Sequence, residues 1–480
     1  MDMIIAGRSA QALSGRTIEI KNPATGELID SVPRASAEDV ALAIDSAVRG
    51  RAIMREMPAH RRSAILRQAS DTIQARHEEL SQLLCRENGK TIRQCRGEMT
   101  ATARLFLDFA EEAKRLRGQS IPMDAVPGLE HMIAYTQRQP LGVVVGIVPF
   151  NYPAELFAHK IPGALAAGNA VIVKLPEQCP LTVLEIGRIL LEAGLPGDAL
   201  SLITGFPQDL GDGLVTHPEV AMVSFTGGVV AARLIAEKAA ATLKRTAFEL
   251  GGVDAMLVLD DADLDLAAAA VVQGRLTNGA GQICCAVKQV LVAEPVYDRF
   301  LSLLLDKVKA IKLGDPQGDD TEIGPLICEA AAERVHREVQ QCVAMGAKVL
   351  AGGERIGKNF YAPTVMVDVA ADMPCLTGEI FGPVAPITPF REVKEAIATI
   401  NASPYGLQAS VFSESVHHAL GVARRLEVGG VVVNGPGSFR PGNVPFGGVK
   451  QSGIGCESIT DTVREMSHET AIVLNQRSGL

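Results

Sequence analysis

A single cysteine carries the plainest chemical signal in the sequence. Cys284 stands directly behind a Gly-Gln-Ile turn at 281–283, and a carboxylate, Glu249, lies in the separate segment 248–252 (FELGG). A thiolate can attack a carbonyl carbon, and a carboxylate can then activate the water that releases the acyl group. The two groups together predict covalent catalysis on a carbonyl compound.

Short apolar runs, which we expect to be buried strands, come just before several polar groups. The runs cover 142–148, 170–174 and 220–225, and helical patterns separate them. Asn151 follows the first run and Lys174 ends the second. A doubly wound sheet binds its ligands at the carboxyl ends of its strands. The order of these runs therefore places the polar groups at a ligand-binding edge.

The alternation of short strands with longer helical patterns predicts an α/β protein with parallel sheets. Ser36 and Asp39 mark a helix start, and two further helical patterns are expected between 60 and 112. A second α/β series follows Gly252, with expected strands at 255–259, 289–292 and 431–434. The predicted fold is a Rossmann-like doubly wound cofactor domain, a second α/β catalytic domain and a small β ribbon.

Composition argues against several classes of partner. The 480 residues include 46 basic and 55 acidic side chains, a net charge of -9, whereas nonspecific binding to nucleic acid or anionic lipid depends on excess positive charge. No apolar run reaches the roughly 18 residues that span a bilayer, and the N-terminus has no signal-peptide pattern. Nine cysteines without CxxC spacing fit a reducing cytoplasm and no metal site.

Several further motifs, in order along essentially the whole chain, resemble the aldehyde dehydrogenase superfamily. They are PFNYP at 149–153, VKLPE at 173–177, SFTGG at 224–228, EIFGPV at 379–384 and PFGGVK at 445–450. The resemblance implies an enzyme that oxidises an aldehyde to the carboxylic acid without acylating coenzyme A. It also implies NAD as the cofactor, with NADP as the alternative.

In that family the positions of Cys284, Asn151 and Glu249 carry the reaction. The resemblance implies that Cys284 is the nucleophile and that the Asn151 amide, with the Cys284 backbone N–H, holds the oxyanion. Glu249 would be the general base, and Glu457 aligns with a second, assisting carboxylate. Each position also has a purely structural interpretation: a buried cysteine, a turn-forming asparagine or a solvated glutamate.

Cofactor residues are implied by the same resemblance. A carboxylate at Glu177 can accept hydrogen bonds from both ribose hydroxyls of NAD and would repel a 2′-phosphate, although a surface ion pair with Lys174 is the plain alternative. Gly228 and Ala232 depart from the commoner family pattern of serine and glycine. The other predicted cofactor residues are Lys174, Phe150, Thr226, Gly227, Gly228, Leu250, Gly251, Glu379 and Phe381.

The predicted substrate residues are Arg104, Tyr152, Ile283, Cys285 and Arg440. Two of them, Arg104 and Arg440, resemble positions used by relatives whose aldehydes carry an anionic group, and paired arginine hydrogen bonds suit such anions. The alternative is that both are surface groups. We predict a short aldehyde with a hydroxyl or anionic group, of the lactaldehyde, glyceraldehyde 3-phosphate, semialdehyde or phosphonoacetaldehyde type.

The resemblance also implies a domain division and an assembly. We predict a cofactor domain at 1–120 and 141–250, a catalytic domain at 251–450, and an oligomerisation element at 121–140 and 451–480, which would build a homodimer or homotetramer. Two other functions compete with this prediction. One is a dehydrogenase that acylates coenzyme A, against which Glu249 argues, and the other is a non-catalytic binding or structural member of the fold.

Overall fold

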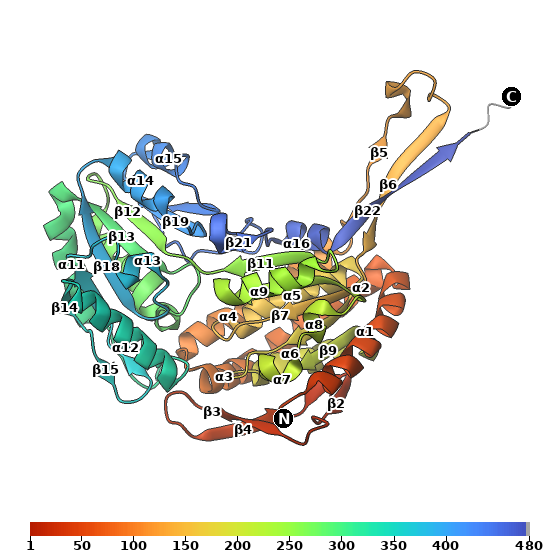
Figure 1. Ribbon diagram of the computed structural model, residues 1–480, viewed down its shortest axis with the longest axis horizontal. Helices are drawn as coiled ribbons and strands as arrows, with labels where there is room; N and C mark the ends of the chain where they lie inside the picture. The colour runs from red at the N-terminus through yellow and green to blue at the C-terminus, as the bar shows by residue number, and fades with distance from the viewer. Residues whose placement is uncertain (477–480) are drawn as a thin grey trace.

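Two open sheets and a projecting ribbon organise the chain (Figure 1). This computed structural model describes residues 1–476. Within those residues no helix is both long enough and apolar enough to cross a membrane.

The first sheet has eight strands, and its five central strands run parallel. Its strands are buried on both faces, as expected where helices cover a parallel sheet: Val144 and Val171 face one helical layer, and Val143 and Ile172 face the other. In sheet order the strands are β2 (Arg8–Ala10), β1 (Met3–Ile5), β9 (Leu200–Ile203), β8 (Ala170–Lys174), β7 (Val143–Ile147), β10 (Val220–Gly227), β11 (Arg245–Leu250) and β21 (Gly453–Ile454).

The helices of this part of the chain include the one predicted to start at Ser36. That start is confirmed, because the Ser36 N–H donates to Asp39 Oδ2 at 2.8 Å. The helices are α1 (Ala37–Glu56), α2 (Ala59–Ala75), α3 (His77–Asn88), α4 (Ile92–Glu112), α5 (Pro153–Ala167), α6 (Leu181–Glu192), α7 (Pro207–Leu210), α8 (Gly213–Thr216), α9 (Val229–Ala240) and α16 (Ile459–Glu465).

The prediction of two helical patterns between 60 and 112 is wrong, since α2, α3 and α4 are three helices. The buried positions Leu66, Ile73 and Leu80 keep one regular spacing across the break between α2 and α3. Periodicity alone therefore does not reveal that break. Gly89 ends α3 with a φ of 84°, a left-handed conformation that glycine adopts at little cost.

The second sheet has seven strands, all parallel except the edge strand β14. Met256 and Leu257 of its central strand face opposite helical layers. The strands are β14 (Lys348–Ala351), β17 (Thr364–Val367), β18 (Val384–Phe390), β13 (Val287–Ala293), β12 (Asp254–Val258), β19 (Gln408–Phe412) and β20 (Gly430–Val433). The helices are α10 (Leu264–Val271), α11 (Tyr297–Lys309), α12 (Glu329–Ala344), α13 (Pro374–Thr377), α14 (Val393–Ala402) and α15 (Val416–Ala423).

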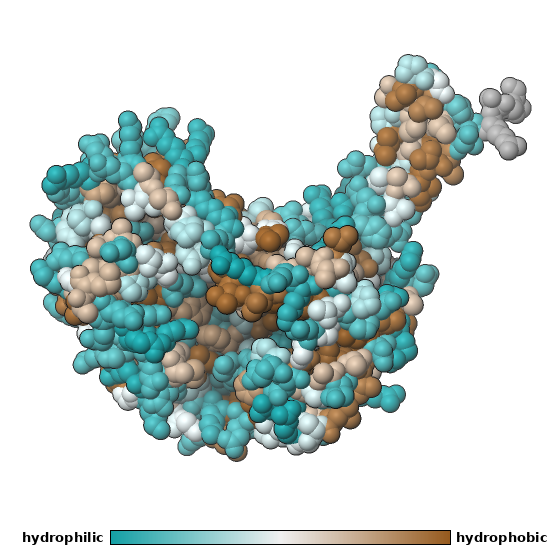
Figure 2. Space-filling model, in the orientation of Figure 1, coloured by the Kyte–Doolittle hydropathy of each residue, from teal (hydrophilic) through white to brown (hydrophobic). Residues whose placement is uncertain are grey.

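A three-stranded ribbon projects away from both sheets (Figure 1). It contains β5 (Ser120–Ile121), β6 (Met132–Pro140) and β22 (Ser467–Asn475), and β22 pairs antiparallel with β6 along its whole length. Figure 2 shows apolar side chains gathered on this ribbon. Two small hairpins complete the fold: β3 (Thr17–Lys21) with β4 (Leu28–Pro33), and β15 (Arg355–Ile356) with β16 (Phe360–Tyr361).

The predicted α/β fold class, with a Rossmann-like sheet and a second parallel sheet, is confirmed. The division into domains stays a prediction. Within the predicted element at 451–480, β21 pairs with β11 of the first sheet, whereas β22 belongs to the ribbon. Residues 477–480 of that element lie outside the described residues.

Candidate active site

Cys284 lies on an irregular turn that leads into β13. Residues 272–277 form a π-helical turn and 278–281 a 3-10 turn, in which Gly279, Ala280 and Gly281 all have positive φ. A left-handed conformation costs a residue with a Cβ about 1 kcal/mol or more, so the surroundings must hold Ala280 in place. The turn leaves Cys284 partly exposed, as a group that meets a ligand must be.

Buried side chains fix the shape of this turn. The Arg275 guanidinium, 1% exposed, donates to the carbonyls of Gly281 at 3.4 Å and Ile380 at 2.9 Å. The Gln282 amide donates to the Gly279 carbonyl at 3.1 Å and accepts from the Ile327 N–H at 3.2 Å. The turn that carries Cys284 is thus tied to the segment between α13 and β18, which carries Glu379 and Phe381.

A buried lysine lies directly behind the candidate nucleophile. Lys288, 1% exposed, donates through Nζ to the Cys284 carbonyl and lies 2.9 Å from Glu379 Oε1. Lys288 therefore joins the cysteine backbone to a predicted cofactor carboxylate. The positive charge of Lys288 also favours a thiolate nearby.

One cavity brings the predicted nucleophile and the predicted oxyanion amide together. It has a volume of about 230 Å³, and we call it the inner cavity. Cys284, from the second sheet's side, and Asn151, from the connection between β7 and α5, both line it. Its other lining residues are Pro149, Phe150, Thr226, Gly227, Gly228, Gly251, Arg334, Glu379 and Phe381.

A second cavity, of about 490 Å³, shares Phe150, Thr226, Gly227 and Gly228 with the inner cavity. We call it the outer cavity. Lys174 and Glu177 line it and form an ion pair at the end of β8. β10 ends at Gly227 and α9 begins at Val229, so the edge of the first sheet and the start of a helix face this space.

The two cavities fit an extended ligand with hydroxyl groups and negative charge. The Thr226 hydroxyl is buried without a partner within residues 1–476, which leaves it free for a ligand. N–H groups at the start of α9 suit a pyrophosphate. A Cβ at Gly251 would lie 2.1 Å from Glu379 Oε2, so the absence of a side chain at Gly251 leaves room for that carboxylate in its present position. These features suit a dinucleotide.

The two predicted catalytic carboxylates have opposite electrostatic surroundings. Glu249 ends β11 and is 2% exposed, and burial, together with the charge of Glu457, raises its pKa well above the ordinary value. Burial would also raise the pKa of Glu457, but ion pairs with Lys160 and Arg440 hold it at about 2. Glu457 is therefore a fixed negative charge, and Glu249 is the carboxylate that can exchange a proton.

The Cys284 thiol is activated by its surroundings. The neighbouring Cys285 thiol, with help from the charges of Arg440 and Lys288, lowers the pKa of Cys284 to about 7 against the effect of burial. The pKa of the Cys285 thiol is raised in turn. A thiol with a pKa near 7 is substantially ionised at neutral pH, which favours nucleophilic attack.

The predicted substrate residues fall into two groups. Tyr152, Ile283 and Cys285 pack with Cys284 and Phe446 in one apolar cluster. The second group is the two arginines, which line a separate cavity of about 680 Å³, the arginine cavity, together with Glu155 and His159.

The two arginines differ in their surroundings. Arg440 is buried, stacks over the Phe446 ring at 4.0 Å and lies 2.6 Å from Glu457. Its Nε has no partner within residues 1–476. Arg104, with its side chain 71% exposed, pairs with Asp108 at the rim of the cavity.

Several of the predicted residues thus converge on the inner and outer cavities, whereas others do not. Glu249 and Glu457 line neither cavity, Leu250 packs against Phe225 and Phe248, and Arg104 is an exposed rim residue of the arginine cavity. Sequence reasoning missed Arg275, Lys288 and Lys160. Each is a cation at a position that the fold buries completely, and such a cation needs a partner there.

Comparison with known proteins agrees with this geometry. The model of the aldehyde dehydrogenase family matches residues 10–472. The chain is 38% identical to a 3-sulfolactaldehyde dehydrogenase of Priestia aryabhattai, over 95% of both sequences. It is also 38% identical to a mitochondrial succinate-semialdehyde dehydrogenase of Arabidopsis thaliana, over 95% of this chain and 85% of that one.

Among solved structures, the NAD-dependent aldehyde dehydrogenase from Sinorhizobium meliloti superposes with a TM-score of 0.95 at 35% identity, over 100% of this chain and 95% of that one. The fold and the matches define an oxidoreductase of the α/β class. The chain belongs to the aldehyde dehydrogenase family, and the predicted family and enzyme class are confirmed.

Proposed function

We propose that this protein oxidises a short aldehyde to its carboxylic acid with NAD+ or NADP+, through a thioester on Cys284. The observation that carries the proposal is the inner cavity, where Cys284, Asn151 and Glu379 line one space of about 230 Å³. A sulfur nucleophile, an amide donor and a cofactor carboxylate are the groups that this reaction needs together.

The proposed steps follow from the groups around the cavity. The Cys284 thiolate adds to the carbonyl carbon, and the Asn151 amide with the Cys284 backbone N–H stabilises the oxyanion. A nicotinamide held beside Glu379 and Phe381 would supply the hydride acceptor. As the oxyanion collapses to a thioester, the same carbon loses its hydrogen together with the bonding electron pair. Water, giving a proton to Glu249, attacks the thioester, the C–S bond breaks, and the acid leaves as the thiol is restored.

The two cavities support a nicotinamide dinucleotide as the cofactor. Glu177 at the end of β8 would accept hydrogen bonds from the ribose hydroxyls, and Glu379 and Phe381 would contact the nicotinamide end. The Glu177 carboxylate disfavours a 2′-phosphate, so NAD is the proposed cofactor and NADP the alternative.

Burial of Glu249 supports hydrolysis over transfer to coenzyme A. A raised pKa gives this carboxyl the proton affinity that a general base needs. A product assay distinguishes the proposed hydrolysis from the two alternative functions. Free acid without added coenzyme A supports hydrolysis, dependence on coenzyme A supports the acylating alternative, and no turnover with any aldehyde supports a non-catalytic role.

The substrate class rests on the arginine cavity. Arg440 offers a buried guanidinium with an unpartnered Nε, which suits an aldehyde whose far end carries a carboxylate, sulfonate or phosphate. The relatives act, by their names, on 3-sulfolactaldehyde and succinate semialdehyde, which are short and anionic. We propose an aldehyde of this kind, with a neutral hydroxyaldehyde as the second candidate.

This substrate class predicts a charge-dependent Michaelis constant. We expect Arg440→Ala to raise KM for succinate semialdehyde about tenfold or more, as expected when one hydrogen bond to a charged group is lost. KM for butyraldehyde, which has the same length and no charge, should change little. Arg104→Ala is the matched control at the exposed rim. Unchanged KM for the anionic aldehyde in both variants would contradict anion recognition by this cavity.

We also propose that the protein assembles as a homodimer or homotetramer through the ribbon. Several large apolar side chains of the ribbon are exposed: Ile121, Val126, Ile133, Val473 and Leu474. A projecting strand pair with an apolar surface and open edges is protected when a second copy covers it.

A further inference from the structure

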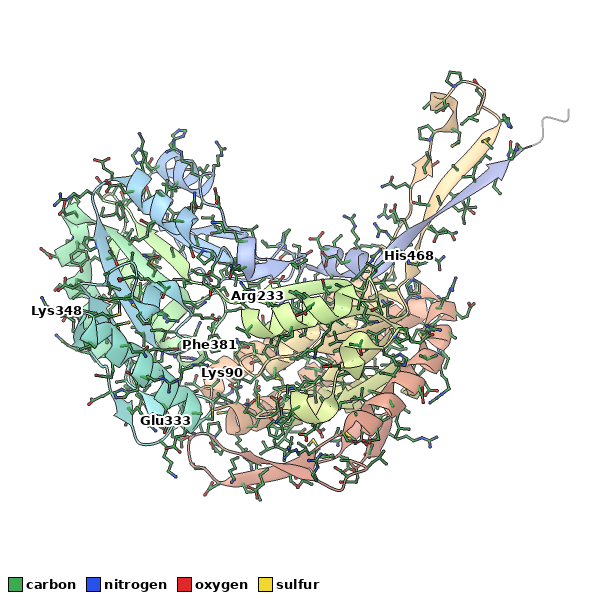
Figure 3. The ribbon with its side chains drawn as sticks, viewed as in Figure 1. Lys90, Arg233, Glu333, Lys348, Phe381 and His468 are labelled. Atoms are coloured by element: carbon green, nitrogen blue, oxygen red, sulfur yellow. The ribbon has the colours of Figure 1, made fainter. Side chains whose placement is uncertain are left out.

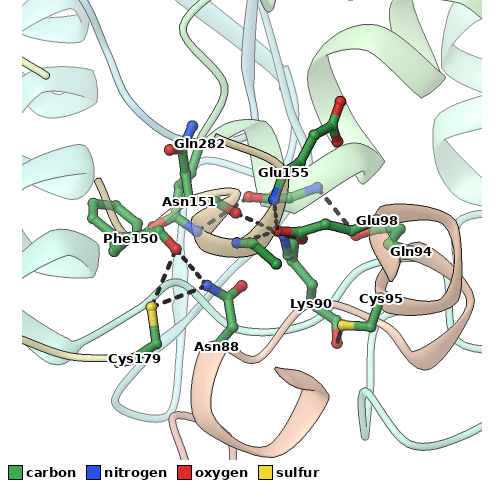
Figure 4. Close-up of polar contacts among 12 residues, drawn as sticks. Asn88, Lys90, Gln94, Cys95, Glu98, Phe150, Asn151, Glu155, Cys179 and Gln282 are labelled. Carbon is green, nitrogen blue, oxygen red and sulfur yellow. Dashed lines mark hydrogen bonds and ion pairs between the residues drawn. The ribbon is translucent and has the colours of Figure 1, made fainter. Parts of the chain in front are cut away.

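A buried ion pair lies beneath the backbone of Asn151 (Figure 4). The side chains of Lys90 and Glu98 are 3% and 0% exposed, and neither lines the inner cavity. Lys90 Nζ donates to the Asn151 carbonyl at 2.7 Å. In the view of Figure 3, Lys90 lies at the junction of the two sheets.

Glu98 holds the chain on the other side of Asn151. Its Oε1 accepts from the N–H groups of Ala154 at 3.0 Å and Glu155 at 3.2 Å, in the first turn of α5. These N–H groups have no partner within the helix, so the carboxylate caps α5. Lys90 also lies over the Tyr152 ring, 3.7 Å from its centroid. The pair therefore contacts the chain from Asn151 to Glu155.

The same segment reaches the nucleophile turn. Asn88 Nδ2 donates to the Phe150 carbonyl at 2.6 Å, just before Asn151. Gln94 donates to the Thr277 carbonyl at 3.1 Å and accepts from the Gly279 N–H at 3.1 Å. One stretch of chain, 88–98, thus holds both the turn that carries Cys284 and the loop that carries Asn151.

Stability alone does not explain these charges, because replacing a buried ion pair by apolar groups is often neutral or stabilising. A role in positioning does explain these buried charges, because a misplacement of about 1 Å lowers the rate of an active site about 10²-fold. We propose that Lys90 and Glu98 are positioning residues, which fix the position of the Asn151 amide relative to the Cys284 sulfur. This inference rests on the proposed function, in which that amide binds the oxyanion.

The test compares catalysis with simple thiol reactivity. Lys90→Met keeps the side-chain length and removes the donor, and Lys90→Met/Glu98→Gln also removes the carboxylate charge that would otherwise stay buried without its partner. We expect both variants to oxidise lactaldehyde at saturating NAD+ with kcat lower by about tenfold to a hundredfold. Iodoacetamide should still alkylate Cys284 at the wild-type rate, because that reaction forms no oxyanion.

A double-mutant cycle separates positioning from a general structural role. Asn151→Ala alone should lower kcat by about 10²–10³. Adding Lys90→Met to Asn151→Ala should lower kcat by less than about twofold more, because the effects of substitutions that act through one group are not additive. The matched control is Glu87→Gln, since Glu87 is buried and caps α6 through the N–H groups of Leu181 and Thr182. It should leave kcat unchanged.

Two results would overturn the inference alone: wild-type kcat in Lys90→Met, or a Lys90→Met loss that persists in full when Asn151 is alanine. Two others would overturn the proposed function and the inference with it. These are a wild-type protein without aldehyde oxidation, and an Asn151→Ala variant with undiminished kcat.

Discussion

At the scale of single residues, the chemistry depends on how neighbouring groups tune one thiol and one carboxyl. Cys284 is activated chiefly by Cys285, with the charges of Arg440 and Lys288 in support. Burial, together with the charge of Glu457, raises the pKa of Glu249 above that of an ordinary glutamate. Adjacent groups with pKa values pushed in opposite directions are typical of acid–base sites.

The effect of the Cys285 thiol on its neighbour predicts a shifted pH profile. In the wild type, the alkylation rate of Cys284 should rise with pH, with a midpoint of about 7. Cys285→Ala removes the neighbouring thiol, so the pKa of Cys284 should rise toward that of a free cysteine, about 8.5. The thiolate fraction at pH 7 then falls and alkylation slows, while the rates converge at high pH.

Peptide mass spectrometry with iodoacetamide, at a series of pH values, measures this profile. Cys85→Ala removes another buried thiol, in α3, and serves as the control. A midpoint that does not move in Cys285→Ala would show that Cys285 has no part in activating the nucleophile.

At the scale of elements, the sequence predicts strand ends far better than the contacts between elements. β8 has the predicted bounds, and the bounds of β10 and β12 lie within two residues of the predicted ones. These strands are predictable because a parallel strand buried on both faces has a continuous apolar sequence. Polar groups at their ends then fall at the ligand edge. The motif residues Asn151 and Cys284 reach one cavity for this reason.

What the sequence could not show is how distant segments hold each other. Lys90, Arg275 and Lys288 look like ordinary surface cations in the sequence, yet the fold buries each of them. Each also has a partner far along the chain: the Asn151 carbonyl for Lys90, the Ile380 carbonyl for Arg275 and the Glu379 carboxylate for Lys288. No local spacing encodes those distant contacts. The break at Arg76 was missed for a related reason, since the apolar periodicity runs across it.

At the scale of the whole molecule, the ribbon should determine the oligomeric state. Ile133 and Leu474 are opposite one another on β6 and β22, and both are exposed. The double variant Ile133→Lys/Leu474→Glu removes the apolar surface and leaves a favourable charge pair across the strands. We expect it to elute near the mass of one chain, 50.7 kDa, in light scattering after size exclusion.

Leu13→Lys, at an exposed apolar residue far from the ribbon in sequence, is the control and should keep the wild-type assembly. An unchanged mass for the double variant, or a wild type that is itself a monomer, would rule out assembly through the ribbon.

The central claim is that oxidation leaves an acyl group on Cys284, which Glu249 helps water to remove. The direct measurement is the mass of the peptide that carries Cys284, in a Glu249→Gln variant incubated with NAD+ and aldehyde. Hydrolysis should fail while the first half-reaction proceeds. We predict about one NADH per active site and a peptide heavier by the aldehyde less two hydrogens. An unmodified Cys284 peptide, or wild-type turnover in this variant, would contradict the account.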